Sequence, residues 1–113
     1  MSYSSLATKY IPAHSNNHWG KRTEPIRKIV LHHMAGKLTG EACAKTFQNP
    51  SRGASASYCI GYKGDIVCGL DEAYVPGTSG GYNVDKDSVT IETSNSKSGG
   101  DWPISDEHLV IFL

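Results

Sequence analysis

Two histidines and a glutamate are the residues of this sequence best suited to do chemistry. His32 and His33 follow the apolar run at 29–31, within "IRKIVLHHMAG". A histidine at the end of a strand, with its ring on the side of a cleft, is a typical metal ligand or general base. Glu92 lies in "SVTIETS". A glutamate beside a metal-bound water can take a proton from it and later return it.

Each of these residues also has a structural interpretation. One histidine can be a surface residue and the other a hydrogen-bonded core residue, while Glu92 can be a solvated residue of an edge strand. Neighbouring residues of a strand point to opposite faces, so only one of His32 and His33 can look into a given site. The residue types leave that choice open.

Two runs of the sequence predict strands that would position these side chains. They are "IRKIVLH" at 26–32 and "SVTIETS" at 88–94, and both alternate with a period of two. His32 is expected to share a face with Val30, and Glu92 to share one with Thr90. The residues expected on the opposite faces are Ile29, Leu31, Val89 and Ile91.

A short helix is predicted between the two strands, within "LTGEACAKTFQNP". Thr39 is a suitable N-cap because its hydroxyl can accept a hydrogen bond from the first turn. Pro50 marks the end of the segment. Ala42, Cys43 and Phe47 are expected to form the buried stripe of the helix.

A β-hairpin is predicted in "SYCIGYKGDIVCGL". A two-residue turn at Lys63 and Gly64 would place Cys59 opposite Cys68. Such a pair would be either two small buried hydrophobic residues or a cross-strand disulfide formed on exposure to oxidant. The chain has three cysteines and no C-x-x-C pair, which favours free thiols in a cytosolic protein.

The remaining segments are predicted to be irregular, apart from a last helix. Residues 1–24 are interpreted as an N-terminal arm and 25–113 as the body of the domain, with 71–87 a long Gly-rich loop. Ser105 is a suitable N-cap for a final helix whose apolar residues 109–113 are typical of the middle of a core helix. The sequence is therefore expected to be shorter than the full ancestral domain.

Composition excludes several classes of function. The 113 residues are enough for one domain. Lys and Arg number 11, as do Asp and Glu, so the charge footprint of a nucleic-acid-binding protein is missing. No apolar run approaches the roughly 20 residues of a membrane span. The N-terminus "MSYSSLATKY" has no secretory signal pattern.

Three segments, taken in order, resemble a known family. "IVLHHMAG", "SRGASASYCIGYKGDI" and "VTIETSN" followed by "DWPISDEHL" are similar to the type 2 N-acetylmuramoyl-L-alanine amidases, above all those of bacteriophage endolysins and prophage lysins. The resemblance implies an α/β fold with a mixed β-sheet flanked by helices, like that of peptidoglycan-recognition proteins but incomplete at its C-terminus.

The resemblance also implies a function. It implies a zinc-dependent peptidoglycan hydrolase that cleaves the amide bond between N-acetylmuramic acid and L-alanine of the stem peptide. Such a lysin would stay in the host cytoplasm without a signal peptide and act on the cell wall after release. Peptidoglycan would be its partner, and neither nucleic acid nor a membrane is implied.

Specific residues carry over from the family. His32 corresponds to the first zinc ligand, and His33 would then point away as a structural residue. Glu92 corresponds to the catalytic glutamate, acting as base toward a zinc-bound water and then as acid toward the leaving amine. The zinc would also polarise the amide carbonyl.

Other positions depart from the family pattern or have more than one interpretation. Thr78 or Ser79 stands where many members carry a histidine, and would contact substrate, stabilise the developing oxyanion, or be a plain loop hydroxyl. Tyr58, in the second matching segment, is a further candidate for substrate binding.

The family's remaining zinc ligands lie beyond the helix expected at Ser105 and are not in this sequence. The spacing of His14, His18, His108 and the cysteines does not support a substitute ligand set. The alternatives are a catalytically incompetent peptidoglycan-binding module, or an unrelated α/β protein. A complementary chain or a second copy, docked through the apolar C-terminal helix, would complete the site.

Overall fold

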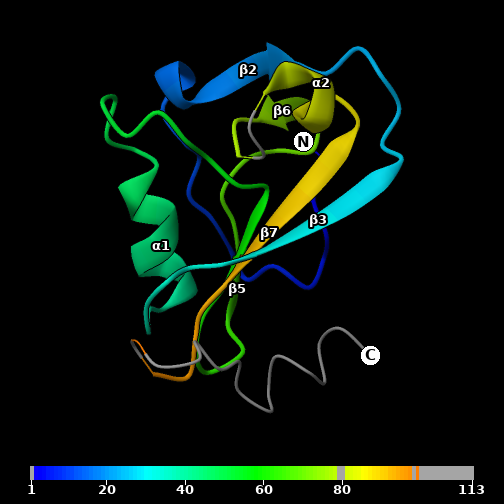
Figure 1. The fold of residues 1–113 in the computed structure, drawn as a ribbon. Helices are drawn as coiled ribbons and strands as arrows, with labels where there is room; N and C mark the ends of the chain where they lie inside the picture. The colour runs from blue at the N-terminus through cyan, green and yellow to red at the C-terminus, as the bar shows by residue number, and fades with distance from the viewer. Residues whose placement is uncertain (1, 79–80, 98, 100–113) are drawn as a thin grey trace.

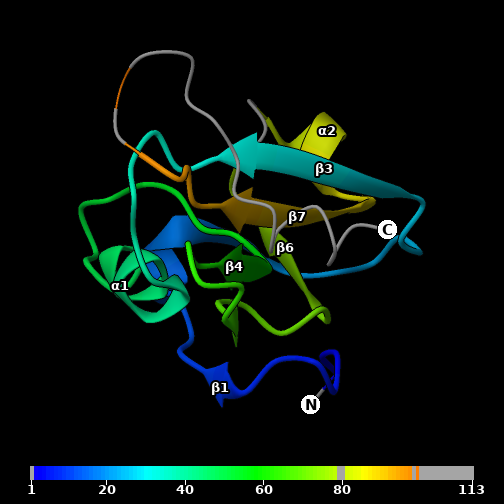
Figure 2. The same cartoon turned by 90° about the horizontal axis from the view of Figure 1, so that it is seen from below.

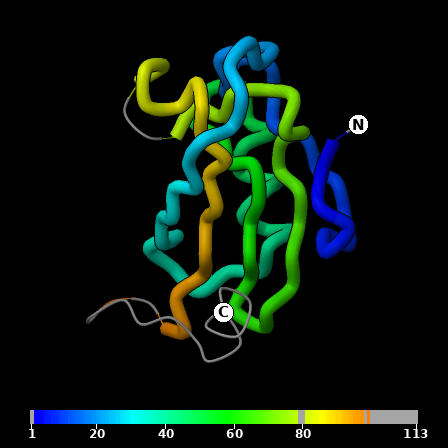
Figure 3. The backbone as a smooth tube through the Cα atoms, turned by 90° about the vertical axis from the view of Figure 1, so that its right-hand side faces the viewer, coloured from blue at the N-terminus to red at the C-terminus, as the bar shows by residue number. Residues whose placement is uncertain are grey.

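A computed structural model describes residues 2–78, 81–97 and 99 of the chain. Their main feature is a five-stranded sheet in the order β1-β5-β4-β7-β3, which Figure 3 shows across the sheet from β3 to β1. Its strands are β1 (Lys9–Tyr10), β3 (Lys28–His33), β4 (Tyr58–Ile60), β5 (Ile66–Cys68) and β7 (Ser88–Thr93).

The sheet is mixed, as the sequence predicted. β3 and β4 both pair with β7 in parallel, β4 and β5 form an antiparallel hairpin, and β1 adds to β5 in parallel. Helix α1 (Gly40–Thr46) packs against one face of the sheet, and β3 and β7 run side by side in the same direction (Figure 2). The expectation of an α/β fold with a mixed sheet is confirmed.

A smaller layer lies at the end of the sheet where β3 and β7 begin (Figure 1). It contains a two-stranded antiparallel sheet and two short helices. Its elements are η1 (Ser15–Asn17), β2 (His18–Lys21), β6 (Tyr74–Pro76) and α2 (Tyr82–Asp85).

The small layer corrects two sequence predictions. Residues 1–24 are not an irregular arm, because β1 pairs with β5 and β2 pairs with β6. Residues 71–87 likewise contain β6 and α2 and are not one long loop. The strands in both segments are only two to four residues long, which is too short to show the apolar periodicity that reveals a strand.

The predicted alternation of β3 and β7 is confirmed, and it gives the sheet two distinct faces. The site face carries His32, Glu92 and Cys59, which are partners in register on three adjacent strands. Residues paired in register project to the same side of a sheet. On this face α1 buries Cys43, Ala44 and Phe47 against Cys59 and Val67.

The opposite face is apolar and partly open among the described residues. Ile29 and Leu31 keep 68% and 55% of their surface exposed, and with Ile91 and Leu6 they line a hollow of about 490 Å³. The helix predicted to begin at Ser105, through which a second chain was expected to dock, lies outside the described residues.

The helix prediction is confirmed with one change. The Thr39 hydroxyl accepts a hydrogen bond from Ala42 N–H at 3.0 Å, as expected of an N-cap. Cys43 and Phe47 are buried, but the third buried position is Ala44 and not Ala42, which is exposed. Ala44 faces the sheet because it is adjacent to Cys43 on the inner side of this two-turn helix.

The hairpin prediction is wrong by one residue. The loop holds three residues, 62–64, and closes with Gly61 N–H donating to Asp65 O at 2.8 Å. Gly64 takes a positive φ of 84°, which is typical of a three-residue hairpin loop. The register therefore pairs Tyr58 with Cys68 and Cys59 with Val67. Cys59 and Cys68 project to opposite faces, so the disulfide alternative is excluded; all three cysteines are free and buried.

Arg22 ties the small layer to the main sheet. Its guanidinium donates to four backbone carbonyl oxygens, those of Glu72, Tyr74, Lys86 and Ser88, at 2.8 to 3.2 Å. These carbonyls belong to the segments around β6 and to the start of β7. One side chain therefore fixes the small layer against the end of the sheet.

None of the helices in the described part of the chain combines the length and the apolar character needed to cross a membrane.

Replacing Arg22 by lysine is expected to lower the free energy of unfolding by about 2 kcal/mol, because one ammonium cannot serve four carbonyls in a planar fork. Urea unfolding monitored by far-UV circular dichroism measures the change. The neighbouring exposed residue gives a control, and Lys21→Gln should alter stability by less than about 0.5 kcal/mol. Equal stabilities for the wild type and Arg22→Lys would contradict the role of Arg22.

Candidate functional site

His32 and Glu92 lie next to each other on the site face. They are paired in register between the parallel strands β3 and β7, so their side chains leave the sheet on the same side. Both are half-buried. His33 projects to the opposite side, and its Nδ1 accepts a hydrogen bond from Ala35 N–H at 3.2 Å. Strand alternation therefore brings His32, and not His33, to the glutamate.

The ends of these two strands are joined by polar contacts that hold the pair in place. Met34 N–H donates to Thr93 O at 2.7 Å, directly after the pair. Asn95 is fully buried and makes two bonds to Gly36: its backbone N–H donates to Gly36 O, and its side-chain oxygen accepts from Gly36 N–H. The loop after β3 thus cannot separate from β7 without breaking buried hydrogen bonds.

The carboxylate of Glu92 is partly buried from solvent. Burial raises the pKa of its carboxyl, while the positive charges of His32, Arg52 and His33 act in the opposite direction. A glutamate with a raised pKa exchanges protons more readily near neutral pH than an ordinary surface carboxylate. The environment of Glu92 therefore favours its protonated form more than a surface position would.

A catalytic zinc takes three protein ligands and leaves one position open. His32 offers an imidazole beside Glu92, which fits one ligand of such a site. Within residues 2–78, 81–97 and 99, however, no group of three or more His, Cys, Asp or Glu side chains could hold a metal ion. The described residues therefore supply part of a zinc site and not a complete one.

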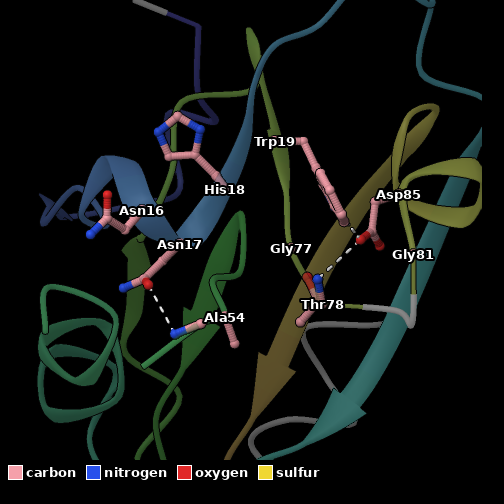
Figure 4. Close-up of a pocket in the computed structure, with 10 residues that line it drawn as sticks. Asn16, Asn17, His18, Trp19, Ala54, Gly77, Thr78, Gly81 and Asp85 are labelled. Atoms are coloured by element: carbon pink, nitrogen blue, oxygen red, sulfur yellow. Dashed lines mark hydrogen bonds between the residues drawn. The ribbon is translucent and has the colours of Figure 1, made fainter. Parts of the chain in front are cut away.

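A polar pocket of about 410 Å³ is lined mainly by residues of the small layer, and neither His32 nor Glu92 is among its lining residues (Figure 4). Trp19 forms one wall, and Asn17 and Ala54 lie across from it. Gly77 and Thr78 lie at its base. The pocket reaches the strand that carries Glu92, because the hydroxyls of Thr78 and Thr90 are hydrogen-bonded at 2.9 Å and Thr90 is two residues before Glu92 on the same face.

The residues predicted to bind substrate fall in different places. Thr78 lines the pocket, but its hydroxyl is already used by Ser55 O at 2.6 Å and by Thr90. Ser79 lies outside the described residues. Tyr58 lies on the opposite face of the sheet, where its hydroxyl contacts the Glu72 carboxylate and accepts from Ser4 N–H. The structure therefore does not bring Tyr58 to this site.

Three pocket residues were missed by sequence reasoning. Trp19 donates its indole N–H to the buried Asp85 at 2.9 Å, and Asp85 also accepts from Thr78 N–H. Asn17, also buried, donates to the carbonyls of Phe47 and Asn49. The only sequence signal was a tryptophan in an otherwise polar stretch, "HSNNHWGKR".

Comparisons with known proteins agree with this architecture. Residues 22–110 match the family model described as N-acetylmuramoyl-L-alanine amidase. A comparison with curated protein sequences finds no significant match.

Solved structures with the same fold include a mutant endolysin from Bacillus subtilis (TM-score 0.67, 20% identity, 85% of this chain and 66% of that chain). They also include the catalytic domain of XlyA (TM-score 0.63, 22% identity), where the match covers 83% of this chain and 63% of that chain. A third is the Drosophila peptidoglycan recognition protein SA (TM-score 0.61, 20% identity), where the match covers 89% of this chain and 65% of that chain. This chain therefore spans only about two thirds of the length of each of these three chains.

Replacing Glu92 by glutamine is expected to stabilise the protein at pH 7. The raised pKa means that Glu92 favours the folded state fully below its ordinary pKa of about 4.3, and that this contribution is lost as the pH rises through the folded-state value. Glutamine avoids the loss, so the stabilisation should be clear at pH 7 and disappear toward pH 4. Urea unfolding at several pH values measures it.

The matched control is Glu41→Gln on the surface of α1. Lys9 and Lys45 lower the pKa of Glu41 to about 2, so removing that charge should not increase stability at pH 7. A Glu92→Gln protein that is less stable than the wild type at pH 7 would show that the carboxylate is a favourable structural charge.

Proposed function

This chain belongs to the N-acetylmuramoyl-L-alanine amidase family, and on that premise we propose that it acts on peptidoglycan. The proposed reaction is hydrolysis of the amide bond between the lactyl group of N-acetylmuramic acid and L-alanine of the stem peptide. The observation that carries the proposal is the His32–Glu92 pair, which is in register on one face. A pocket large enough for part of a ligand is linked to the same strand by the hydrogen bond of Thr78 with Thr90.

Glu92 is proposed as the general base and then the general acid. Its carboxylate takes a proton from the attacking water as the water oxygen bonds to the amide carbonyl carbon. When the carbon–nitrogen bond breaks, the same proton goes to the nitrogen of the leaving L-alanine. The raised pKa of Glu92 supports both steps, because a group that titrates closer to neutral pH can accept and return a proton.

His32 is proposed as a zinc ligand rather than a base. A zinc ion bound there would supply Lewis-acid chemistry for the amide carbonyl. The proposal for His32 rests on its position beside Glu92 and on the family, since the described residues do not complete the ligand set. Thr78 and Ser79 stay proposed as substrate contacts of the adjoining loop, and for Thr78 the free hydrogen-bonding capacity is limited.

A second candidate function is peptidoglycan binding without hydrolysis. It is favoured by the partial metal site of the described residues. It is also favoured by the structural likeness to peptidoglycan recognition proteins, one of which was solved with bound tracheal cytotoxin. The site face and pocket would then hold the ligand while Glu92 performed no chemistry.

We also propose where the protein acts, which is the bacterial cell wall. A phage-type lysin of this family would be made in the host cytoplasm and act on the wall after its release. A complementary chain or a second copy of this one is proposed as a source of missing ligands.

Hydrolysis of N-acetylmuramoyl-L-alanyl-D-isoglutamine by the purified 113-residue protein tests the two candidates. With added zinc we expect release of a free L-alanine amine, and loss of that release when a chelator removes the metal. Glu92→Gln should lower the rate by about 10²- to 10⁴-fold, the usual contribution of a general base. The surface variant Glu41→Gln should retain the rate.

Two outcomes would contradict the amidase proposal. A wild-type protein that binds the substrate without cleaving it, at any zinc concentration, would establish the second candidate. Equal rates for the wild type and Glu92→Gln would show that Glu92 is not the base.

A further inference from the structure

The polar pocket that contains Thr78 has an aromatic wall that the proposed chemistry does not use. Trp19 lines this pocket and keeps 53% of its surface exposed. The position of the ring is built into the fold in three ways.

The first is a β-bulge in β2. His18 pairs with Pro76 and Gly20 with Val75, so Trp19 is an extra residue without a partner on β6. Gly20 adopts a φ of +96°, which a residue with a side chain rarely takes. A bulge of this kind redirects the side chain of its extra residue. Here it directs Trp19 to the pocket.

The second and third features that fix the position of the Trp19 ring are its contacts with Asp85 and Tyr82. The indole N–H donates to the Asp85 carboxylate at 2.9 Å, and Asp85 is 1% exposed. Tyr82 packs edge-on against the indole, with ring centroids 5.8 Å apart. Figure 4 shows the ring edge-on with its tip at Asp85, so that it stands as a rigid wall of the pocket.

The rest of the pocket is polar, and its carboxylate, that of Asp85, is bound by two N–H groups. Among the described residues that line it, none is a lysine or arginine. Burial lowers the pKa of His18, which keeps this imidazole uncharged at neutral pH. The Asp85 carboxylate is occupied by the Trp19 and Thr78 N–H groups. The pocket therefore disfavours the carboxylates of a stem peptide and suits an uncharged ligand that has an apolar side and several polar groups.

The pocket is also linked to the strand that carries Glu92. Thr78 joins it to Thr90, two residues from Glu92 on the same face. Gly53 lines the pocket and directly follows Arg52, whose charge acts on Glu92. The pocket is therefore connected to Glu92 through one hydrogen bond and two residues of β7.

We propose that this pocket is a saccharide subsite in which the face of one N-acetylhexosamine ring of the glycan strand packs on the indole of Trp19. A pyranose ring has an apolar C–H face and polar hydroxyl and acetamido groups on its edge, which matches one aromatic wall and a polar, uncharged floor. This inference rests on the proposed function, because it assigns the sugar side of the scissile amide to this side of Glu92.

Binding measurements without chemistry test the proposal. The probe is the disaccharide N-acetylglucosaminyl-N-acetylmuramic acid with its lactyl carboxyl capped as the methylamide, titrated into the 113-residue protein by calorimetry. We expect Trp19→Ala to weaken its binding by about tenfold or more, and Trp19→Phe by about threefold or less, because phenylalanine retains an aromatic face. The free peptide L-alanyl-D-isoglutamine should bind the wild type and Trp19→Ala equally.

Tyr3→Ala, which removes an exposed aromatic ring stacked on Tyr10 outside the pocket, is the matched control and should not change disaccharide binding. If Trp19→Ala does not fold, Trp19→Leu makes the same comparison with an apolar, non-aromatic side chain. The proposal is overturned if the wild type does not bind the disaccharide or if the Trp19 variants bind it as tightly as the wild type does. It is also overturned if the variants weaken binding of the free peptide and not of the disaccharide.

The outcome separates this inference from the proposed function. Disaccharide binding that depends on Trp19, in a protein that releases no alanine, would keep the subsite and reject the hydrolysis. If hydrolysis depends on Glu92 but disaccharide binding is unchanged by the Trp19 substitutions, the proposed reaction stands and the subsite is rejected.

Discussion

The parallel pairing of β3 with β7 is the constraint on which the rest of the structure depends. Six residue pairs run in register from Lys28 and Ser88 to His33 and Thr93. Because side chains alternate along a strand, a slip of one residue would turn Glu92 to the face opposite His32. The bonds at the strand ends, with buried Asn95 holding Gly36, oppose such a slip. A backbone register thus fixes the chemistry of the site face.

Buried hydroxyls and amides, more than a large apolar core, then connect the site to its surroundings. Ser55 and Thr90 are fully buried, and both bond the hydroxyl of Thr78. Such a network is rigid when its polar groups are satisfied, which suits the support of a ligand pocket. Glu92 departs from this pattern, because its partial burial raises its pKa and costs stability in its charged form. A local cost of this kind is expected at a functional site.

The sequence predicted those parts of the structure that follow a simple periodicity. Period-two alternation identified β3 and β7 and assigned His32 and Glu92 to one face each, and Thr39 marked the start of α1. Only the structure, however, shows that the face of β3 that carries His32 and the face of β7 that carries Glu92 lie on the same side of the sheet. The hairpin register failed because a three-residue loop differs from a two-residue loop by one position, which sequence letters such as "YKGD" do not resolve. The wall at Trp19 was missed because it depends on a bulge and on a buried carboxylate 66 residues away.

The central claim, that His32 and Glu92 act on each other across one face in a partly dry environment, is tested most directly by titrating the Glu92 carboxyl. Its ¹³C chemical shift would be followed against pH in the wild type and in His32→Ala. The account predicts a pKa above the ordinary glutamate value in the wild type, and a still higher one in the variant, because the charge of His32 opposes the effect of burial. An ordinary pKa that does not change in His32→Ala would contradict the account.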